Sequence, residues 1–343
     1  MAHMPYATTI GTKVGILTAS VKQPSTSVFT NYNGVGNTRV GYAVPQNSDL
    51  VRTWEVARST SAAPMFFPPK YVTGLGTFQD GGVLRNNPTI IGLSEFSALT
   101  KDAGPDVIIN LGTGSDPERA EPRAWNERPL RFWHNNWLVR LARAYMSLMQ
   151  GQKESRHIGH YRLDIALEGE IRLDDVSSMP FLRSMVLRDT ALEETIEKIA
   201  QRLFAALFYF ELTALPTPLE SRFRIEGYIL CTRKAGDSAL PRISQRLGSS
   251  TLLVDKKATS FEVKYDVHGN IVVPLVFYAN QCFSLEVKQG SYGSSFPLSG
   301  SPYNNSALAL RGGLAALFGN RTHKRKREDS EWHGQQSQRR KFL

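Results

Sequence analysis

The segment from Trp54 to Pro88 constrains the fold of this chain more than any other part of the sequence. A helical pattern over Leu50–Ser61 stops at Ala63-Pro64, because the residue before a proline disfavours the helical conformation. A second helix is predicted over Pro88–Leu99, where an asparagine in the N-cap position precedes a proline in the first turn.

Asp80 lies between these two helices and is followed by Gly81 and Gly82. Glycine adopts backbone angles that are closed to other residues, so we expect the chain to turn sharply beside the carboxylate. A carboxylate held at such a turn is suited to point into a cleft. Taken alone, Asp-Gly-Gly is also a common turn sequence without any catalytic role.

Predicted strands flank this segment on both sides. Val14–Ala19 is an apolar run of strand length, and Ser27–Tyr32 alternates and is expected to pair with it. Val107–Leu111 precedes Gly112 and Gly114, as in a buried parallel strand with a tight exit. The first part of the chain is therefore predicted to be α/β.

The rest of the chain changes character twice. Thr190–Glu193 (T-A-L-E) is a capping box that predicts a long helix over 190–212. Runs typical of strands follow over 222–300, and His268-Gly269-Asn270 is a predicted turn between two of them. We therefore divide the chain into an α/β part (1–190), a helix and linker (190–220), a small antiparallel β-rich domain (222–318) and a disordered basic tail (319–343).

Composition and charge exclude several classes of protein. The chain has only two cysteines, Cys231 and Cys282, which argues against a disulfide-stapled secreted scaffold. No signal peptide is expected at the start, and the longest apolar run is far shorter than the roughly 20 residues of a membrane span. The net charge is +10, and half of it comes from the tail that begins at Arg321, so nucleic-acid binding is expected to be weak and non-specific.

Several ordered motifs resemble those of the patatin-like phospholipases. The helix ends in A-R-S-T-S-A-A-P, and D-G-G and N-N-P follow it in that order. V-F-T-N-Y upstream, I-I-N-L-G-T-G at 108–114, and Y-R-L-D-I at 161–165 with L-D-D at 173–175 extend the resemblance over about residues 10–200. The resemblance implies a partial α/β/α domain, hydrolysis of phospholipid or lysophospholipid esters, no cofactor and no metal.

In that family a serine and an aspartate form the catalytic dyad, and the resemblance assigns the aspartate to Asp80, supported by Gly81 and Gly82. The serine stands in a G-x-S-x-G nucleophile elbow. No G-x-S-x-G occurs in these 343 residues, so the sequence provides no candidate nucleophile. We expect Ser59 and Ser61 to be ordinary helix residues. The chain is thus interpreted as an incomplete gene product or a product of chain splitting, inactive by itself.

Alternative interpretations remain open at this stage. A second hypothesis is that the chain is a non-catalytic binding or regulatory protein that reuses the patatin scaffold. A helix carrying Trp133, Trp137 and Tyr145 packs against the sheet or lies on a bilayer surface as a peripheral membrane contact.

His157 and His160 have the i, i+3 spacing of metal ligands but lack a third ligand. A cytoplasmic location is expected, and Lys324–Arg327 is either a solvated tail, a nuclear localisation patch or an anionic-lipid patch. The oligomeric state is not indicated.

Overall fold

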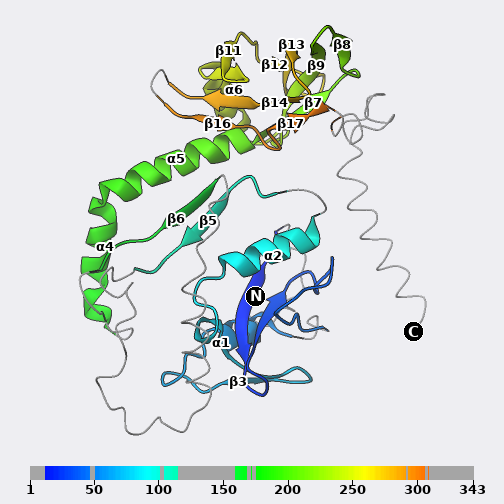
Figure 1. Cartoon of the computed structure of the whole chain (residues 1–343). Helices are drawn as coiled ribbons and strands as arrows, with labels where there is room; N and C mark the ends of the chain where they lie inside the picture. The colour runs from blue at the N-terminus through cyan, green and yellow to red at the C-terminus, as the bar shows by residue number, and fades with distance from the viewer. Residues whose placement is uncertain are drawn as a thin grey trace. The chain divides into compact units, whose positions relative to one another are not determined.

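The computed structural model describes residues 12–46, 51–100, 104–114, 159–167, 171, 175–290, 293–305 and 308. The chain forms a mixed α/β structure with several sheets, and it divides into two compact units. Unit 1 comprises residues 1–105 and 109–187, and unit 2 comprises residues 106–108 and 188–343. Figure 1 shows the elements of both units, coloured along the chain.

Unit 1 is built on a four-stranded sheet in the order β2-β1-β4-β3, with all neighbouring strands antiparallel. A separate two-stranded sheet pairs β5 with β6. The elements are β1 (Gly15–Ser20), β2 (Ser25–Thr30), α1 (Thr53–Thr60), β3 (Lys70–Val72), β4 (Gly76–Asp80), the 3-10 helix η2 (Gly81–Val83), α2 (Thr89–Leu99), β5 (Ile108–Leu111), β6 (His160–Leu163), the 3-10 helix η4 (Val176–Ser178) and α4 (Met179–Arg188).

The predicted pairing of the first two strands and both predicted helices of this unit are confirmed. Gly15 is opposite Thr30 and Ser20 is opposite Ser25 in a tight hairpin. Asn87 lies just outside α2, and its side chain accepts a hydrogen bond from Thr89 N at 3.1 Å. The predicted strand before Gly112 is present as β5, but the side chains of Ile109 and Leu111 are exposed among the described residues, so it is not the buried strand that was expected.

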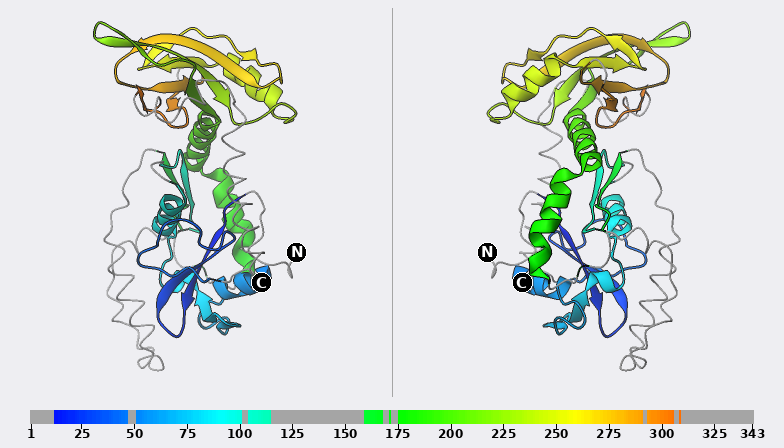
Figure 2. Two further views of the ribbon diagram at one scale, coloured as in Figure 1. Left: turned by 90° about the vertical axis from the view of Figure 1, so that its right-hand side faces the viewer. Right: turned by 90° about the vertical axis from the view of Figure 1, so that its left-hand side faces the viewer.

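Unit 2 contains α5, α6 and the remaining strands. They are α5 (Thr190–Ala206), β7 (Phe208–Leu212), β8 (Thr217–Leu219), β9 (Arg222–Cys231), α6 (Leu240–Gly248), β10 (Thr251–Val254), β11 (Lys257–Thr259), β12 (Lys264–Tyr265), β13 (Ile271–Ala279), β14 (Cys282–Phe283), β15 (Leu285–Lys288), β16 (Ser295–Pro297) and β17 (Tyr303–Asn304). One sheet has the order β12-β13-β9-β7, with β8 on β9, and another has the order β11-β10-β15-β16. Figure 2 shows α6 against one face of these strands.

The long predicted helix of unit 2 is shorter than expected. Asp189, rather than Thr190, caps α5, because its side chain accepts a hydrogen bond from Leu192 N at 2.9 Å. The helix ends at Ala206, and the last five residues of the predicted range form β7. Phe208 and Phe210 alternate into the core of unit 2, and their strand pairs with β9. Burial of both rings on one face of a sheet thus overrides the helical pattern.

The predicted turn at His268-Gly269-Asn270 is confirmed. Asp266 Oδ1 accepts hydrogen bonds from His268 N and Asn270 N, both at 2.9 Å, and Gly269 has a positive φ of 79°. Cys231 is buried and Cys282 is exposed, and both are free thiols. Most of residues 306–318, the tail and the predicted helix with Trp133 lie outside the described residues.

Candidate active site around Asp80

Asp80 is the last residue of β4, in the interior of the four-stranded sheet of unit 1. Its main chain is opposite Thr18 of β1, and its amide donates a hydrogen bond to Ala62 O at 3.1 Å. Ala62 follows the C-terminus of α1 and is fully buried. The backbone of Asp80 is therefore fixed by a strand on one side and by the end of a helix on the other.

The carboxylate of Asp80 is half-buried, and its two oxygens have different surroundings. Oδ1 accepts a hydrogen bond from Gly82 N at 2.8 Å, which caps η2. Within the described parts of the chain, Oδ2 has no hydrogen-bond partner. One oxygen therefore orients the group, and the other is free to accept a proton, which is the geometry that a general base requires.

Gly81 is needed for a reason that differs from the sequence interpretation. Neither Gly81 nor Gly82 has a positive φ, so the turn does not use angles that are closed to other residues. A Cβ added to Gly81 would lie 2.7 Å from the carbonyl oxygen of Leu17 in β1. Close approach of two backbones, and not backbone conformation, thus explains glycine at this position. At Gly82 an added Cβ would meet side chains alone, Asp80 Oδ1 at 3.2 Å and Asn86 Oδ1 at 3.8 Å.

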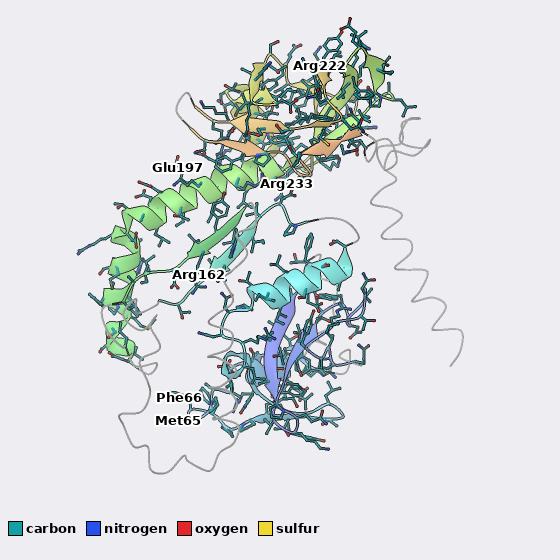
Figure 3. All side chains as sticks on the ribbon, in the orientation of Figure 1. Met65, Phe66, Arg162, Glu197, Arg222 and Arg233 are labelled. Atoms are coloured by element: carbon teal, nitrogen blue, oxygen red, sulfur yellow. The ribbon has the colours of Figure 1, made fainter. Side chains whose placement is uncertain are left out.

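A network of polar side chains joins three of the motifs that were recognised separately in the sequence. Asn110 Nδ2 donates to Asn87 Oδ1 at 2.8 Å and also to the Thr89 hydroxyl. Arg162 Nη1 donates to Asn110 Oδ1 at 2.8 Å, and Arg162 Nη2 donates to Asp164 at 2.6 Å. The network thus connects N-N-P before α2, I-I-N-L-G-T-G in β5 and Y-R-L-D-I in β6. Figure 3 shows Arg162 on β6.

Asp164 closes this network on the glycine-rich exit of β5. Its Oδ1 accepts a hydrogen bond from Gly114 N at 2.8 Å. Burial alone would raise the pKa of Asp164, but the bonds from Gly114 and Arg162 outweigh it and hold the pKa below its ordinary value. Asp164 is therefore a fixed anion, and it holds the loop after β5 in place. Single motifs gave no signal for this network, because its partners are up to 52 positions apart in the chain.

The two serines at the end of α1, Ser59 and Ser61, have structural roles. Ser59 is fully buried in α1, and its hydroxyl donates to Glu55 O at 2.7 Å. Ser61 is the C-cap residue of α1, and its hydroxyl donates to Arg58 O at 3.5 Å. Both hydroxyls are thus bonded to carbonyls one turn back. The expectation that Ser59 is an ordinary helix residue is confirmed, and Ser61 caps the same helix.

Of the candidate histidines and aromatic residues, the structure describes only His160. His160 lies in β6, and His157, Trp133, Trp137 and Tyr145 lie outside the described residues. Within the described ranges, no group of three His, Cys, Asp or Glu side chains is arranged to hold a metal ion. In the same ranges, no helix has both the length and the apolar character needed to cross a membrane.

Comparison with known proteins confirms the resemblance that the motifs indicate. Residues 6–93 match the model of the patatin-like phospholipase family, and this stretch carries α1, Asp80 and the start of α2. The mouse (Mus musculus) calcium-independent phospholipase A2-gamma is 35% identical over 91 residues, which are 26% of this chain and 11% of that protein. Residues 6–93 are thus a patatin-like phospholipase segment.

Two further relatives match over longer stretches. A cGAMP-activated phospholipase of Escherichia coli (strain TW11681) is 27% identical over 177 residues, covering 47% of this chain and 49% of the relative. The rat (Rattus norvegicus) 85/88 kDa calcium-independent phospholipase A2 is 25% identical over 225 residues, covering 55% of this chain and 27% of the relative. The chain therefore spans between about a tenth and a half of the length of these relatives.

Proposed function

We propose that this chain supplies the base of a patatin-type acyl-ester hydrolase that acts on phospholipids or lysophospholipids. The observation that carries the proposal is the Asp80 carboxylate, which is oriented through Oδ1 by Gly82 N at 2.8 Å while Oδ2 stays open. The names of the three relatives, all phospholipases, support a lipid substrate. The family match covers Asp80 itself.

In the proposed reaction Asp80 accepts the proton of a serine hydroxyl directly. The serine oxygen then attacks the ester carbonyl, the alcohol leaves with a proton, and water hydrolyses the acyl-serine in the second half-reaction. The serine and the oxyanion donors belong to a G-x-S-x-G elbow and an upstream glycine-rich loop, and these 343 residues contain no G-x-S-x-G. We therefore propose that this chain alone does not hydrolyse esters.

The second candidate is a non-catalytic binding or regulatory role. The absence of the elbow motif from the sequence favours it, and so does the self-contained core of unit 2, where 21 buried residues form one cluster. In this hypothesis residues 222–318 form a β-rich domain that provides the function. The two candidates differ in the role of Asp80, which experiment can test. In the second candidate Asp80 is only a turn residue.

A chimera separates the two candidates. The segment of the Escherichia coli relative that precedes the matched region is fused ahead of residue 6, and hydrolysis of a p-nitrophenyl acyl ester and of a phospholipid is measured. The first candidate predicts turnover by the chimera and none by the present chain. Asp80→Asn in the chimera is expected to lower kcat by about 10²- to 10⁴-fold, because the amide cannot accept the proton. A chimera that is active and indifferent to Asp80→Asn would refute the assignment of Asp80.

The matched control is Asp164→Asn in the same chimera. Asp164 is also a half-buried carboxylate of unit 1, but it holds the loop after β5 and is not assigned the proton transfer. We expect its loss to act through the position of that loop. The pH profile of kcat should therefore be unchanged in Asp164→Asn, and its kcat should fall much less than that of Asp80→Asn.

A further inference from the structure

The loop after α1 exposes apolar side chains without interruption. All six residues of Pro64–Pro69 (P-M-F-F-P-P) are exposed, and the exposed fractions of Met65, Phe66 and Phe67 are 80%, 50% and 55%. Isolated apolar residues are common on protein surfaces, but a contiguous group of this kind marks an interaction site. Figure 3 shows the side chains of Met65 and Phe66 at the periphery of unit 1.

The backbone of this loop is fixed, even though its side chains are exposed. The amides of Phe66 and Phe67 both donate to Ala63 O, at 3.2 and 3.0 Å. Met65 has a positive φ of 79°, which is rare for a long side chain. Three prolines restrict the loop further. Glycine would adopt the positive φ at position 65 without strain. Methionine at this position therefore indicates that its side chain has a function.

Basic and aromatic side chains surround the loop. The Arg58 guanidinium lies 5.1 Å from the centre of the Phe67 ring and donates to Pro68 O at 2.9 Å. Arg58 is partly buried, and its Nη1 is a buried atom that has no hydrogen-bond partner in the described parts of the chain. The Lys70 ammonium lies 4.6 Å from the centre of the exposed Trp54 ring, and it pairs with Glu55 at 3.2 Å. Residues 51–73 contain three basic residues and one acidic residue, so the net charge of this stretch is +2.

We infer that this face, the Met65 loop with Trp54, Arg58 and Lys70, docks onto the surface of an anionic phospholipid bilayer. Apolar tips that enter the acyl region, aromatic rings at the interface and cations that face the headgroups are the features of an interfacial anchor. The inference rests on the proposed lipid substrate and adds how the chain reaches it. The anchor is directly linked to the candidate site, since Ala62, two residues before Pro64, accepts the hydrogen bond from the Asp80 amide.

The test is co-sedimentation of the full chain with phosphatidylcholine vesicles, with and without phosphatidylserine. Wild type is expected to bind the phosphatidylserine vesicles. Met65→Ser and Phe66→Ser should each lower the partition coefficient by about tenfold, the value of one apolar side chain removed from lipid. Lys70→Gln should lower it by about fivefold, and only on phosphatidylserine vesicles. Val267→Ser is the matched control, because Val267 is 95% exposed in unit 2 and should have no effect.

A second variant separates docking from folding. Met65→Gly removes the apolar tip and relaxes the positive φ, so vesicle binding should fall while the melting temperature stays equal or rises. Loop variants that bind like wild type would overturn the inference. If salt then abolished the binding, the basic stretch Lys324–Arg327 would be the membrane contact instead. If Phe66→Ser lowered the melting temperature strongly, the loop would pack against protein, and the inference would again fail.

This test stands apart from the hydrolysis experiment. Vesicle binding needs no nucleophile, so Asp80→Asn should bind vesicles like wild type. Docking without any turnover in the chimera would refute the proposed reaction but keep the anchor. Turnover on a soluble p-nitrophenyl ester without docking would refute the anchor but keep the proposed reaction.

Discussion

The two units differ in what fills their interiors. In unit 2, 21 buried residues form one hydrophobic cluster with several ring contacts, such as Phe277–Phe283 with centroids 5.1 Å apart. Among the described residues of unit 1, the corresponding cluster contains five buried residues, Phe29, Val51, Val56, Val72 and Phe78. Among the described residues, nine of the buried polar or charged side chains belong to unit 1 and four to unit 2.

The two kinds of interior suit the two units to different roles, stability in unit 2 and the positioning of side chains in unit 1. Unit 2 gains its stability mainly by removing apolar surface from water. Unit 1 holds polar side chains in fixed orientations through hydrogen bonds, as in the network of Asn87, Asn110 and Arg162. Fully satisfied polar networks give rigidity and uniqueness rather than large net stability. Unit 1 is therefore the part suited to position a reacting group, and unit 2 is suited to fold around its own core.

The largest effect is expected in the core of unit 2. Phe283 is buried to 2% exposure and touches the rings of Phe210, Phe277 and Tyr303. Phe283→Ala should lower the free energy of unfolding of unit 2 by about 3–5 kcal/mol, because the cavity cannot close fully. Hydrogen exchange followed by mass spectrometry should show faster exchange in peptides from β9 and β13, and no change in β1 and β2. Equal loss of protection in both units would show that they unfold together and would break the comparison.

A somewhat smaller effect is expected at the buried ion pair of unit 1. Glu95 in α2 accepts hydrogen bonds from Arg39 at 3.0 Å, from Tyr32 at 2.6 Å and from Tyr42 at 2.7 Å. Glu95→Gln leaves the Arg39 guanidinium, which is 8% exposed, without its counter-charge. We expect a loss of about 3 kcal/mol at neutral pH, measured by urea denaturation. Glu211→Gln is the control and should cost less than 1 kcal/mol. Glu211 is a carboxylate of β7 in unit 2, and among the described residues it has no such ion pair.

The same carboxylate predicts a pH dependence. Burial alone would raise the pKa of Glu95, but the bonds from Arg39 and the two tyrosines outweigh it, so the pKa lies below its ordinary value of 4.5. A carboxylate with a lowered pKa stabilises the folded state above its unfolded pKa, and this contribution is lost as the pH falls through the folded pKa. Thermal melts below pH 4.5 should therefore show a steeper loss of stability in wild type than in Glu95→Gln. If the stability of wild type and of Glu95→Gln fell equally as the pH was lowered, protonation of Glu95 would not be linked to unfolding.

The smallest effect distinguishes the two glycines after Asp80. Gly81→Ala places a Cβ 2.7 Å from the Leu17 carbonyl oxygen, so β1 and η2 must move apart, and we expect a cost of about 1–3 kcal/mol. Gly82→Ala meets the side chains of Asp80 and Asn86 but no backbone atom, and it should cost less. Chemical denaturation of the two variants measures the difference. An equal cost in both would show that the close approach of β1 and η2 does not explain Gly81.

The sequence predicted local elements well and long-range contacts poorly. Proline and asparagine signals located α1 and α2, an apolar run located β1, and alternation located β2. Local patterns could not decide between helix and strand at Phe208–Leu212, where burial of alternate rings settled the outcome. Similarly, the pairing of Arg39 with Glu95, 56 positions apart, left no local trace. The motifs N-N-P, I-I-N-L-G-T-G and Y-R-L-D-I were recognisable by resemblance, but only the structure shows that they are one hydrogen-bonded network.

We propose that this chain contributes the base Asp80 of a serine hydrolase site but no nucleophile. The most direct measurement is reaction with a fluorophosphonate probe, which labels activated serines, followed by mass-spectrometric mapping of the labelled peptide. The 343-residue chain should remain unlabelled, whereas the chimera with the elbow segment should be labelled at the elbow serine and lose that label with Asp80→Asn. Stoichiometric labelling of any serine of the present chain, together with ester hydrolysis, would contradict the account.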